Sequence, residues 1–274
     1  MIAVQHRYSG HLGMKGVLLF AAMLFAAAQA HAGRPCEERP ATPQTVGRAL
    51  DLALRTREQL DESGATLALI ARAGQDLSRW GLHYSHMGFV WRDHPKGQWT
   101  VVHELNECGT ATSEIYDEGL GNFFLDDLWR MEAVILVPPP AMQQRLAAIL
   151  AGGKHVPFHQ PQYSMVAYPF STRYQNSNQW TLEVLAMASA RDVSIDSREQ
   201  AQSWLKMAGY EPKELKLDAF TRLGARMTRA NVAFDDHPNE LRYSDRIRTV
   251  TVDSVLRFVE RRDPDARRIE IAAR

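Results

Sequence analysis

The sequence predicts an α+β fold in which a small antiparallel sheet packs on a central helix, with further helices added at both ends. Aromatic and β-branched residues in Tyr84 to Trp91 and in Trp99 to Leu105 flank a Pro/Gly turn, a pattern typical of a β-hairpin. An apolar run from Thr181 to Ala190 follows the polar cluster Tyr174 to Trp180 and indicates a buried helix over 176–190. Four apolar side chains of this helix recur at helical spacing and are expected to face the sheet: Trp180, Val184, Leu185 and Ala188.

The remaining elements follow from caps, breakers and apolar spacing. Thr42 and Pro43 fit an N-cap followed by a proline at the first helical position, and Ser63-Gly64 ends that helix. Further strands are expected over 66–72, 133–137 and 163–168, and further helices over 141–150, 197–207, 219–230 and 253–261. Residues 107–130 are expected to form a loop with short helices, and the charged tail 263–274 is expected to fray.

The composition narrows the range of functional classes that are expected for this protein. The 274 residues are 45% hydrophobic and 23% charged, which is ordinary for a globular protein. The 32 basic side chains balance the 32 acidic ones and form no stripe, so no nucleic-acid partner is expected. No phosphate-binding glycine loop is present, and no cofactor or metal is expected. Asp235-Asp236-His237 could ligate a metal, but Pro238 follows and a turn is favoured.

The N-terminus fits a secretory signal peptide over residues 1–32. Lys15 precedes an apolar run from Val17 to Ala30, and Ala30-His31-Ala32 supplies a small-x-small cleavage site. The alternative, a membrane anchor, is disfavoured because the run is short for a bilayer span. Met14 is an alternative start. The prediction is a periplasmic protein with one α+β domain over 33–262, a tail over 263–274 and no integral membrane span after signal removal.

Two cysteines remain in the mature chain. An even count in an oxidising compartment favours a disulfide between Cys36 and Cys108 over two free thiols. Neither cysteine has the electropositive helix-start setting that activates a thiol.

Two histidines lie on the predicted hairpin. His86 shares a strand face with Gly88, and His103 shares one with Val101 and Leu105. In a suitable register His86 and His103 are neighbours on the same face. Glu104 should point to the other face of its strand.

Several short motifs resemble those of a family of secreted bacterial proteins, domain of unknown function 2145. The motifs are Arg-Ala-Gly-Gln-Asp-Leu (72–77), Ser-His-Met-Gly-Phe (85–89), Val-His-Glu-Leu-Asn (102–106), Tyr-Gln-Asn-Ser-Asn-Gln-Trp (174–180) and Asp-Asp-His-Pro (235–238). The resemblance covers nearly the whole mature chain, but the family name implies no activity.

The chain also remotely resembles circularly permuted papain-like proteins, among them NlpC-type hydrolases and relatives of lecithin-retinol acyltransferase. These proteins carry a strand His followed by Gly, a second polar residue on the next strand, and much later Asn-Cys at the start of a buried helix. The resemblance implies a papain-like core and catalytic roles for Ser177, His86 and His103. It also implies oxyanion or substrate contacts from Asn176, Gln175 and Asn178. This sequence departs from the pattern because Ser177 stands where the family has Cys.

That departure leaves two functions open. A serine hydroxyl must pass its proton to a neutral histidine, which a third group orients. With such a Ser/His/His site the protein would be a hydrolase or acyltransferase acting on amide or ester bonds of envelope peptide or lipid. The alternative is a non-catalytic envelope protein whose degenerate cleft binds a peptide or protein. Structurally, Asn176 and Gln179 also fit a helix cap, with Ser177 in the first turn. The partner, whether an envelope peptide, a lipid or a protein, is not specified by the sequence.

Overall fold

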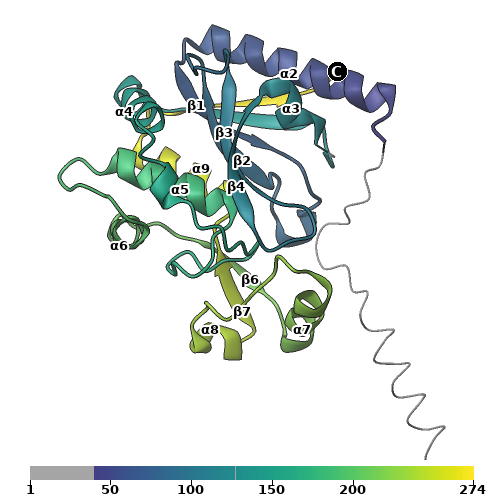
Figure 1. Ribbon diagram of the computed structural model, residues 1–274, viewed down its shortest axis with the longest axis vertical. Coiled ribbons are helices and arrows are strands. Elements are labelled where there is room, and N and C mark those ends of the chain that lie inside the picture. Colours follow the sequence, from purple (N-terminus) through teal and green to yellow (C-terminus); the bar gives the residue numbers. More distant parts are fainter. Residues whose placement is uncertain (1–39, 127) are drawn as a thin grey trace, which may run out of the picture.

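A six-stranded antiparallel sheet forms the centre of the structure, a computed structural model that describes residues 40–126 and 128–274 (Figure 1). The predicted signal peptide and Cys36 lie outside the described residues. In spatial order the strands are β4 (Ser113–Gly119), β3 (Thr100–Asn106), β2 (His86–Trp91), β1 (Leu67–Arg72), β5 (Glu132–Val137) and β8 (Arg267–Ala272). The α+β class and the antiparallel sheet are confirmed, although the sheet is larger than expected.

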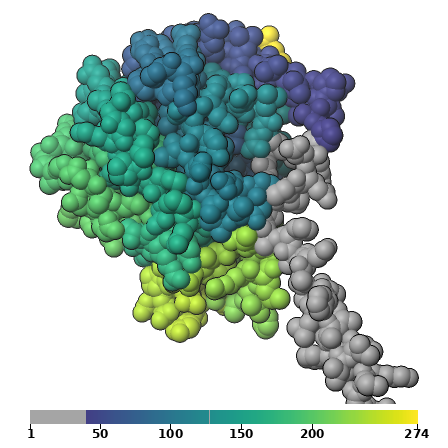
Figure 2. Space-filling view, viewed as in Figure 1, coloured from purple at the N-terminus to yellow at the C-terminus, as the bar shows by residue number. Residues whose placement is uncertain are grey.

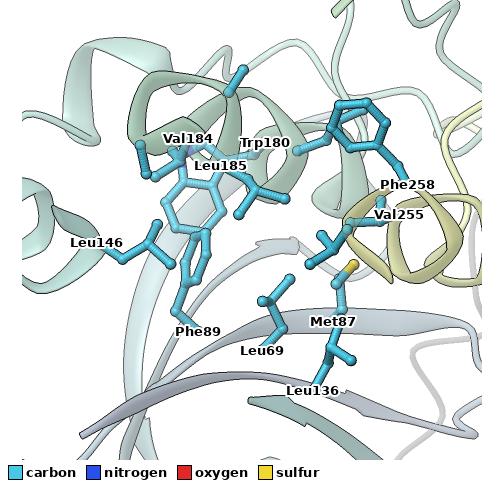
Figure 3. Close-up of a cluster of buried hydrophobic side chains, with 14 of the residues drawn as sticks. Leu69, Met87, Phe89, Leu136, Leu146, Trp180, Val184, Leu185, Val255 and Phe258 are labelled. Atoms are coloured by element: carbon cyan, nitrogen blue, oxygen red, sulfur yellow. The ribbon is translucent and has the colours of Figure 1, made fainter. Parts of the chain in front are cut away.

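The first face of the sheet packs against α5 (Ser177–Ser189), as predicted for the central helix. The Trp180 ring lies 5.8 Å from the Phe89 ring of β2, and Val184 and Leu185 point into the same apolar cluster (Figure 3). All four residues predicted to face the sheet are buried in this cluster. The helices α4 (Pro140–Ala151), α6 (Arg198–Met207) and α9 (Val252–Arg262) add residues to it.

The second face is covered by α2 (Pro43–Ser63) and α3 (Leu120–Leu125). Leu52 of α2 and Phe123 of α3 are buried together with Ile70 and Val90 of the sheet. The predicted ends of α2 are confirmed. The Thr42 hydroxyl accepts a hydrogen bond from the Thr45 N–H at 3.1 Å, and Gly64 ends the helix with a φ of 70°, which glycine adopts without strain.

A lobe projects from the sheet at the end of the molecule opposite α2 (Figures 1 and 2). It consists of β6 (Lys213–Lys216), α7 (Ala219–Thr228), α8 (Asn239–Tyr243) and β7 (Arg246–Thr249). β6 and β7 pair antiparallel, and five buried apolar residues form the core of the lobe: Leu215, Leu217, Val232, Phe234 and Ile247. The described residues also form two short 3-10 helices, η2 (Ser78–Trp80) and η3 (Val156–Phe158).

Two strands of the large sheet, β4 and β8, lie where the sequence analysis expected none, as do both strands of the lobe, β6 and β7. β8 lies in the tail that was predicted to fray. The tail is ordered because it pairs with β5 and buries Ile271 on the α2 face, while its arginines and Glu270 occupy the exposed edge. β4 falls in the predicted loop 107–130 and pairs with β3 along its whole length. Its Glu, Asp and Gly residues are poor strand formers in isolation, so cross-strand pairing decides its structure.

One predicted strand is absent. Within 163–168 the structure has only an isolated bridge from Tyr163 to Gln175, and the segment otherwise consists of turns and irregular backbone. As for membrane spans, the described residues include no helix that is both long enough and apolar enough to cross a bilayer.

Candidate functional site

His86 and His103 meet on the sheet face that α3 covers. His86 Nε2 lies 2.8 Å from His103 Nδ1, so the predicted neighbourhood of the two histidines is confirmed. His103 Nε2 in turn lies 3.2 Å from Glu118 Oε2 on β4. The three side chains form a hydrogen-bonded chain, here called the His–His–Glu chain.

Gly88 makes this contact geometrically possible. A Cβ atom at residue 88 would lie 2.7 Å from the His103 Cβ and 2.7 Å from the Val102 carbonyl oxygen, closer than real Cβ contacts. With no side chain at that position, His103 occupies the space and the ring of His86, two residues earlier on the same strand face, reaches it diagonally.

Burial and hydrogen bonding determine which atoms of the His–His–Glu chain carry protons. Burial lowers the pKa of His103, although the hydrogen bond to Glu118 raises it, and His103 is therefore neutral at pH 7. The hydrogen bond with His103 holds the pKa of Glu118 below its ordinary value, so Glu118 is a carboxylate that only accepts. Neutral His103 consequently donates from Nε2 to Glu118 and accepts at Nδ1 from the Nε2–H of His86.

Arg72 and α3 enclose the histidine pair. The Arg72 guanidinium donates to the Phe123 carbonyl and, at 2.6 Å, to Asp126 Oδ2. The Phe123 ring lies 6.0 Å from the His86 ring and 5.3 Å from the His103 ring. These contacts place Arg72, the first residue of one of the family motifs quoted above, within the same cluster.

Ser177 begins α5 on the other face of the sheet. Its side chain is buried, with the residue 5% exposed. Because strand residues alternate, His86, Gly88 and Val90 face α3, whereas Met87, Phe89 and Trp91 face α5. The structure therefore does not bring Ser177 to His86, since β2 and β3 lie between the two side chains. Among the described residues no hydrogen bond links Ser177 to a histidine.

The amide side chains of the residues next to Ser177 form hydrogen bonds within the fold. Asn176 caps α5, because its Oδ1 accepts from the Gln179 N–H at 2.8 Å while its Nδ2 donates to Thr249 Oγ1 at 3.0 Å. This is the capping role that the sequence left open. Gln175 donates from Nε2 to Glu183 Oε2 at 2.7 Å and to the Phe158 carbonyl at 2.9 Å. Asn178 donates to the Ser85 carbonyl at 3.3 Å.

Tyr163 contacts Ser177, and Glu104 lies close to Tyr163. Burial raises the pKa of Tyr163 to about 12, and the Ser177 hydroxyl and backbone N–H, which hydrogen-bond to the phenol, lower it. The charge of Glu104 also raises the Tyr163 pKa, which brings Glu104 into the same cluster. Burial raises the pKa of Glu104 itself to about 8, so this carboxyl is protonated at pH 7. Glu104 lies on the strand face opposite His103, as the alternation predicted.

Among the described residues, no base lies beside the Ser177 hydroxyl. Ser177 has a neutral carboxylic acid and a neutral phenol beside it, and neither can take its proton at pH 7. Two surface concavities, one beside β6 and β7 and one beside α9, are lined by neither Ser177 nor the histidines. Within the described ranges no three His, Cys, Asp or Glu side chains are grouped to hold a metal. His237 is bonded at both ring nitrogens, to Asp236 and to the Arg248 carbonyl.

Sequence reasoning missed Glu118 and Tyr163. Glu118 lay in the segment expected to be a loop, and the available signal was the alternation of Glu114, Tyr116 and Glu118 on one strand face. Tyr163 was expected on a strand, where nothing marked it as a neighbour of Ser177. The predicted disulfide stays a prediction, since Cys36 lies outside the described residues while Cys108 lies in the exposed turn after β3.

Fold and site together define an α+β protein with an antiparallel sheet whose two faces each bury a separate polar cluster. The family model for an uncharacterized protein conserved in bacteria, domain of unknown function 2145, matches residues 59–259. The chain therefore belongs to this family, and the resemblance seen in the sequence is confirmed. No curated protein and no solved structure matches the chain.

Proposed function

We propose that this chain is an exported envelope protein that binds a peptide or protein partner and does not transfer acyl groups through Ser177. The observation that supports this proposal is the separation of Ser177 from His86 and His103 by the sheet. A nucleophilic serine needs a base within hydrogen-bond reach, roughly 3 Å, to remove its proton. On the α5 face the two acidic groups of the Ser177 cluster, Glu104 and Tyr163, are protonated at neutral pH.

The proposal also includes a papain-like ancestry and a periplasmic location. A papain-like ancestry is supported by the order of a histidine-bearing hairpin followed by a buried helix that packs on it. The replacement of the expected cysteine by Ser177 fits a member that has lost the acyl-transfer chemistry. The signal peptide, the periplasmic location and the Cys36–Cys108 disulfide are proposed on sequence grounds. Periplasmic release by osmotic shock and an N-terminus at Gly33 would support them, and two titratable thiols in the denatured, unreduced protein would contradict the disulfide.

The proposal is tested by asking whether Ser177 reacts. A fluorophosphonate probe should leave Ser177 unlabelled in the folded protein. In a Ser177→Cys variant the new thiol should resist iodoacetamide until the protein unfolds, because residue 177 is buried. The matched control is Ser244→Cys, at an exposed position, which should react at once. Fluorophosphonate labelling of Ser177 in the native protein, together with ester turnover that Ser177→Ala abolishes, would overturn the proposal.

The His–His–Glu chain favours one second candidate. Glu118 orients His103, and His103 orients His86, which is partly exposed. That order is the order in which a carboxylate supports a general base. A hydrolytic activity that uses His86 without Ser177 would be lost in His86→Ala and reduced in Glu118→Gln, while Ser177→Ala retained it. Turnover of p-nitrophenyl esters by these three variants separates the two candidates.

A further inference from the structure

The helix α7 displays an apolar face to solvent. It is an α-helix of ten residues that buries none of them. Phe220 is 87% exposed, Leu223 57% and Met227 65%. Their spacing of three and four residues places all three on one side of the helix. Large apolar side chains are grouped in this way on a protein surface mainly where something else covers them.

The face is held outward by the rest of the lobe. On the opposite side of the helix Ala225 packs against the lobe core, and Arg222 donates to the Arg242 carbonyl at 2.8 Å. The Asp218 side chain caps the helix by accepting from the Thr221 N–H at 2.7 Å. The helix is therefore anchored, and the direction of its apolar face is fixed by the fold. Because the lobe projects from the sheet, α7 lies at one end of the molecule (Figures 1 and 2).

The charged side chains of the helix itself are all arginines, while the acidic Asp218 caps its N-terminus. From Ala219 to Ala230 the sequence contains three arginines and no acidic residue. Arg222 is paired with Asp245 at 3.4 Å. Arg226 and Arg229 are exposed, and in the part of the chain that the structure describes they form no ion pair. Three apolar side chains cover too little area for a stable protein dimer, which needs about 800 Å² on each partner.

We propose that α7 docks the protein on an anionic phospholipid surface. An anchored amphipathic helix with phenylalanine and leucine on one side and arginines at its edge matches the interfacial helices that lie at the headgroup boundary. Each arginine gains from the negative potential of such a surface. This inference does not rest on the proposed function, because the helix would dock whether or not the protein has a catalytic activity.

The test is methionine oxidation of the full chain by hydrogen peroxide, read residue by residue by mass spectrometry. Met227 lies on the docking face, and Met207 of α6, 79% exposed, is the internal control. Vesicles of phosphatidylglycerol and phosphatidylcholine in equal parts should slow oxidation of Met227 and leave Met207 unchanged. The apolar run over 17–30 is common to all samples and does not affect the comparison between variants.

Charge variants decide whether the surface must be anionic. Arg226→Glu with Arg229→Glu should lose the protection of Met227 and bind the vesicles roughly 30-fold or more weakly. The control, Arg48→Glu with Arg191→Glu, makes the same change of net charge at exposed sites on other segments and should behave as the wild type. Equal oxidation of Met227 with and without anionic vesicles overturns the inference. So does equal protection by pure phosphatidylcholine, or protection without lipid at rising protein concentration, which would indicate a second copy.

Discussion

Replacing Gly88 with alanine tests how the two histidines are brought together. The added Cβ would lie 2.7 Å from both the His103 Cβ and the Val102 carbonyl oxygen, and 3.3 Å from a methyl group of Val101. Two of these atoms belong to the backbone or to a Cβ, so neither can rotate away. Strand β2 must therefore move from β3, and the 2.8 Å hydrogen bond between His86 and His103 is expected to break.

The cost follows from the contacts that are lost. Overpacking a tight interior site costs about 1–3 kcal/mol, and a broken hydrogen bond adds about 1 kcal/mol, so Gly88→Ala should lower the free energy of unfolding by about 2–4 kcal/mol. For a chain of this size the melting temperature should fall by roughly 5–15 °C. The matched control is Gly47→Ala in the exposed interior of α2, where a Cβ meets nothing within 4 Å. That substitution should raise stability by about 0.5–1 kcal/mol.

Urea unfolding followed by circular dichroism measures both variants under the same conditions. A second variant, His103→Gly, removes one of the two clashing atoms but leaves the Val102 carbonyl in place. In the background of Gly88→Ala it should recover stability only in part. A Gly88→Ala protein that unfolds within about 0.5 kcal/mol of the wild type would refute the argument, because strand β2 would then tolerate a side chain at this point.

Three further predictions concern the α5 face. Asn176→Ala should lower the free energy of unfolding by about 1–2 kcal/mol, because it removes the cap of α5; Asn176→Ser, which keeps an uncharged accepting oxygen, should cost less in the same urea titration. Glu183→Ala should lower the free energy of unfolding by about 3–5 kcal/mol, because it removes the carboxylate that pairs with the buried Arg198 at 2.7 Å. The double variant Glu183→Ala with Arg198→Met should regain part of that loss. Equal stability of the single and double variants would contradict the prediction. Between the ordinary carboxyl pKa of 4.5 and the pKa of about 8 of Glu104, the folded protein binds one more proton than the unfolded chain, so the contribution of Glu104 to stability falls as pH rises through that window. Glu104→Gln should therefore be more stable than the wild type at pH 8 and gain little at pH 4. Parallel pH profiles of stability for the two proteins would exclude the raised pKa.

Local patterns in the sequence predicted the elements that form the core of the site. The hairpin, the histidine pair and helix α5 were all visible, because alternation and helical spacing are encoded over a few residues. The strands β4 and β8 were not visible. Their charged residues serve an exposed edge, and only pairing with a partner distant in sequence makes them strands. Glu118 was missed for the same reason, since its role depends on the register between β3 and β4.

The sequence did not decide which face of the hairpin α5 covers. Alternation fixes which side chains of a strand share a face, but the helix that covers that face is chosen by packing across the whole sheet. Both faces of this sheet are buried, so apolar residues on either face gave no preference. The pair of Phe89 and Trp180 places α5 against Met87, Phe89 and Trp91, and that choice turns His86 away from Ser177.

The consecutive residues His103 and Glu104 show what this choice means for the chemistry. Both are buried, and they point to opposite sides of the same strand, so one belongs to the His–His–Glu chain and the other to the Ser177 cluster. A change of rotamer cannot move either side chain to the other face, because the backbone fixes the alternation along the strand. A one-residue shift in the register of β3 would move all of its side chains to the opposite face of the sheet. The histidines and the hydroxyl of the expected serine site are thus both present, but they lie on opposite faces of the sheet. To bring His86 to the Ser177 face, β2 would have to shift its register by one residue, and its six-residue pairing with β1 opposes that shift.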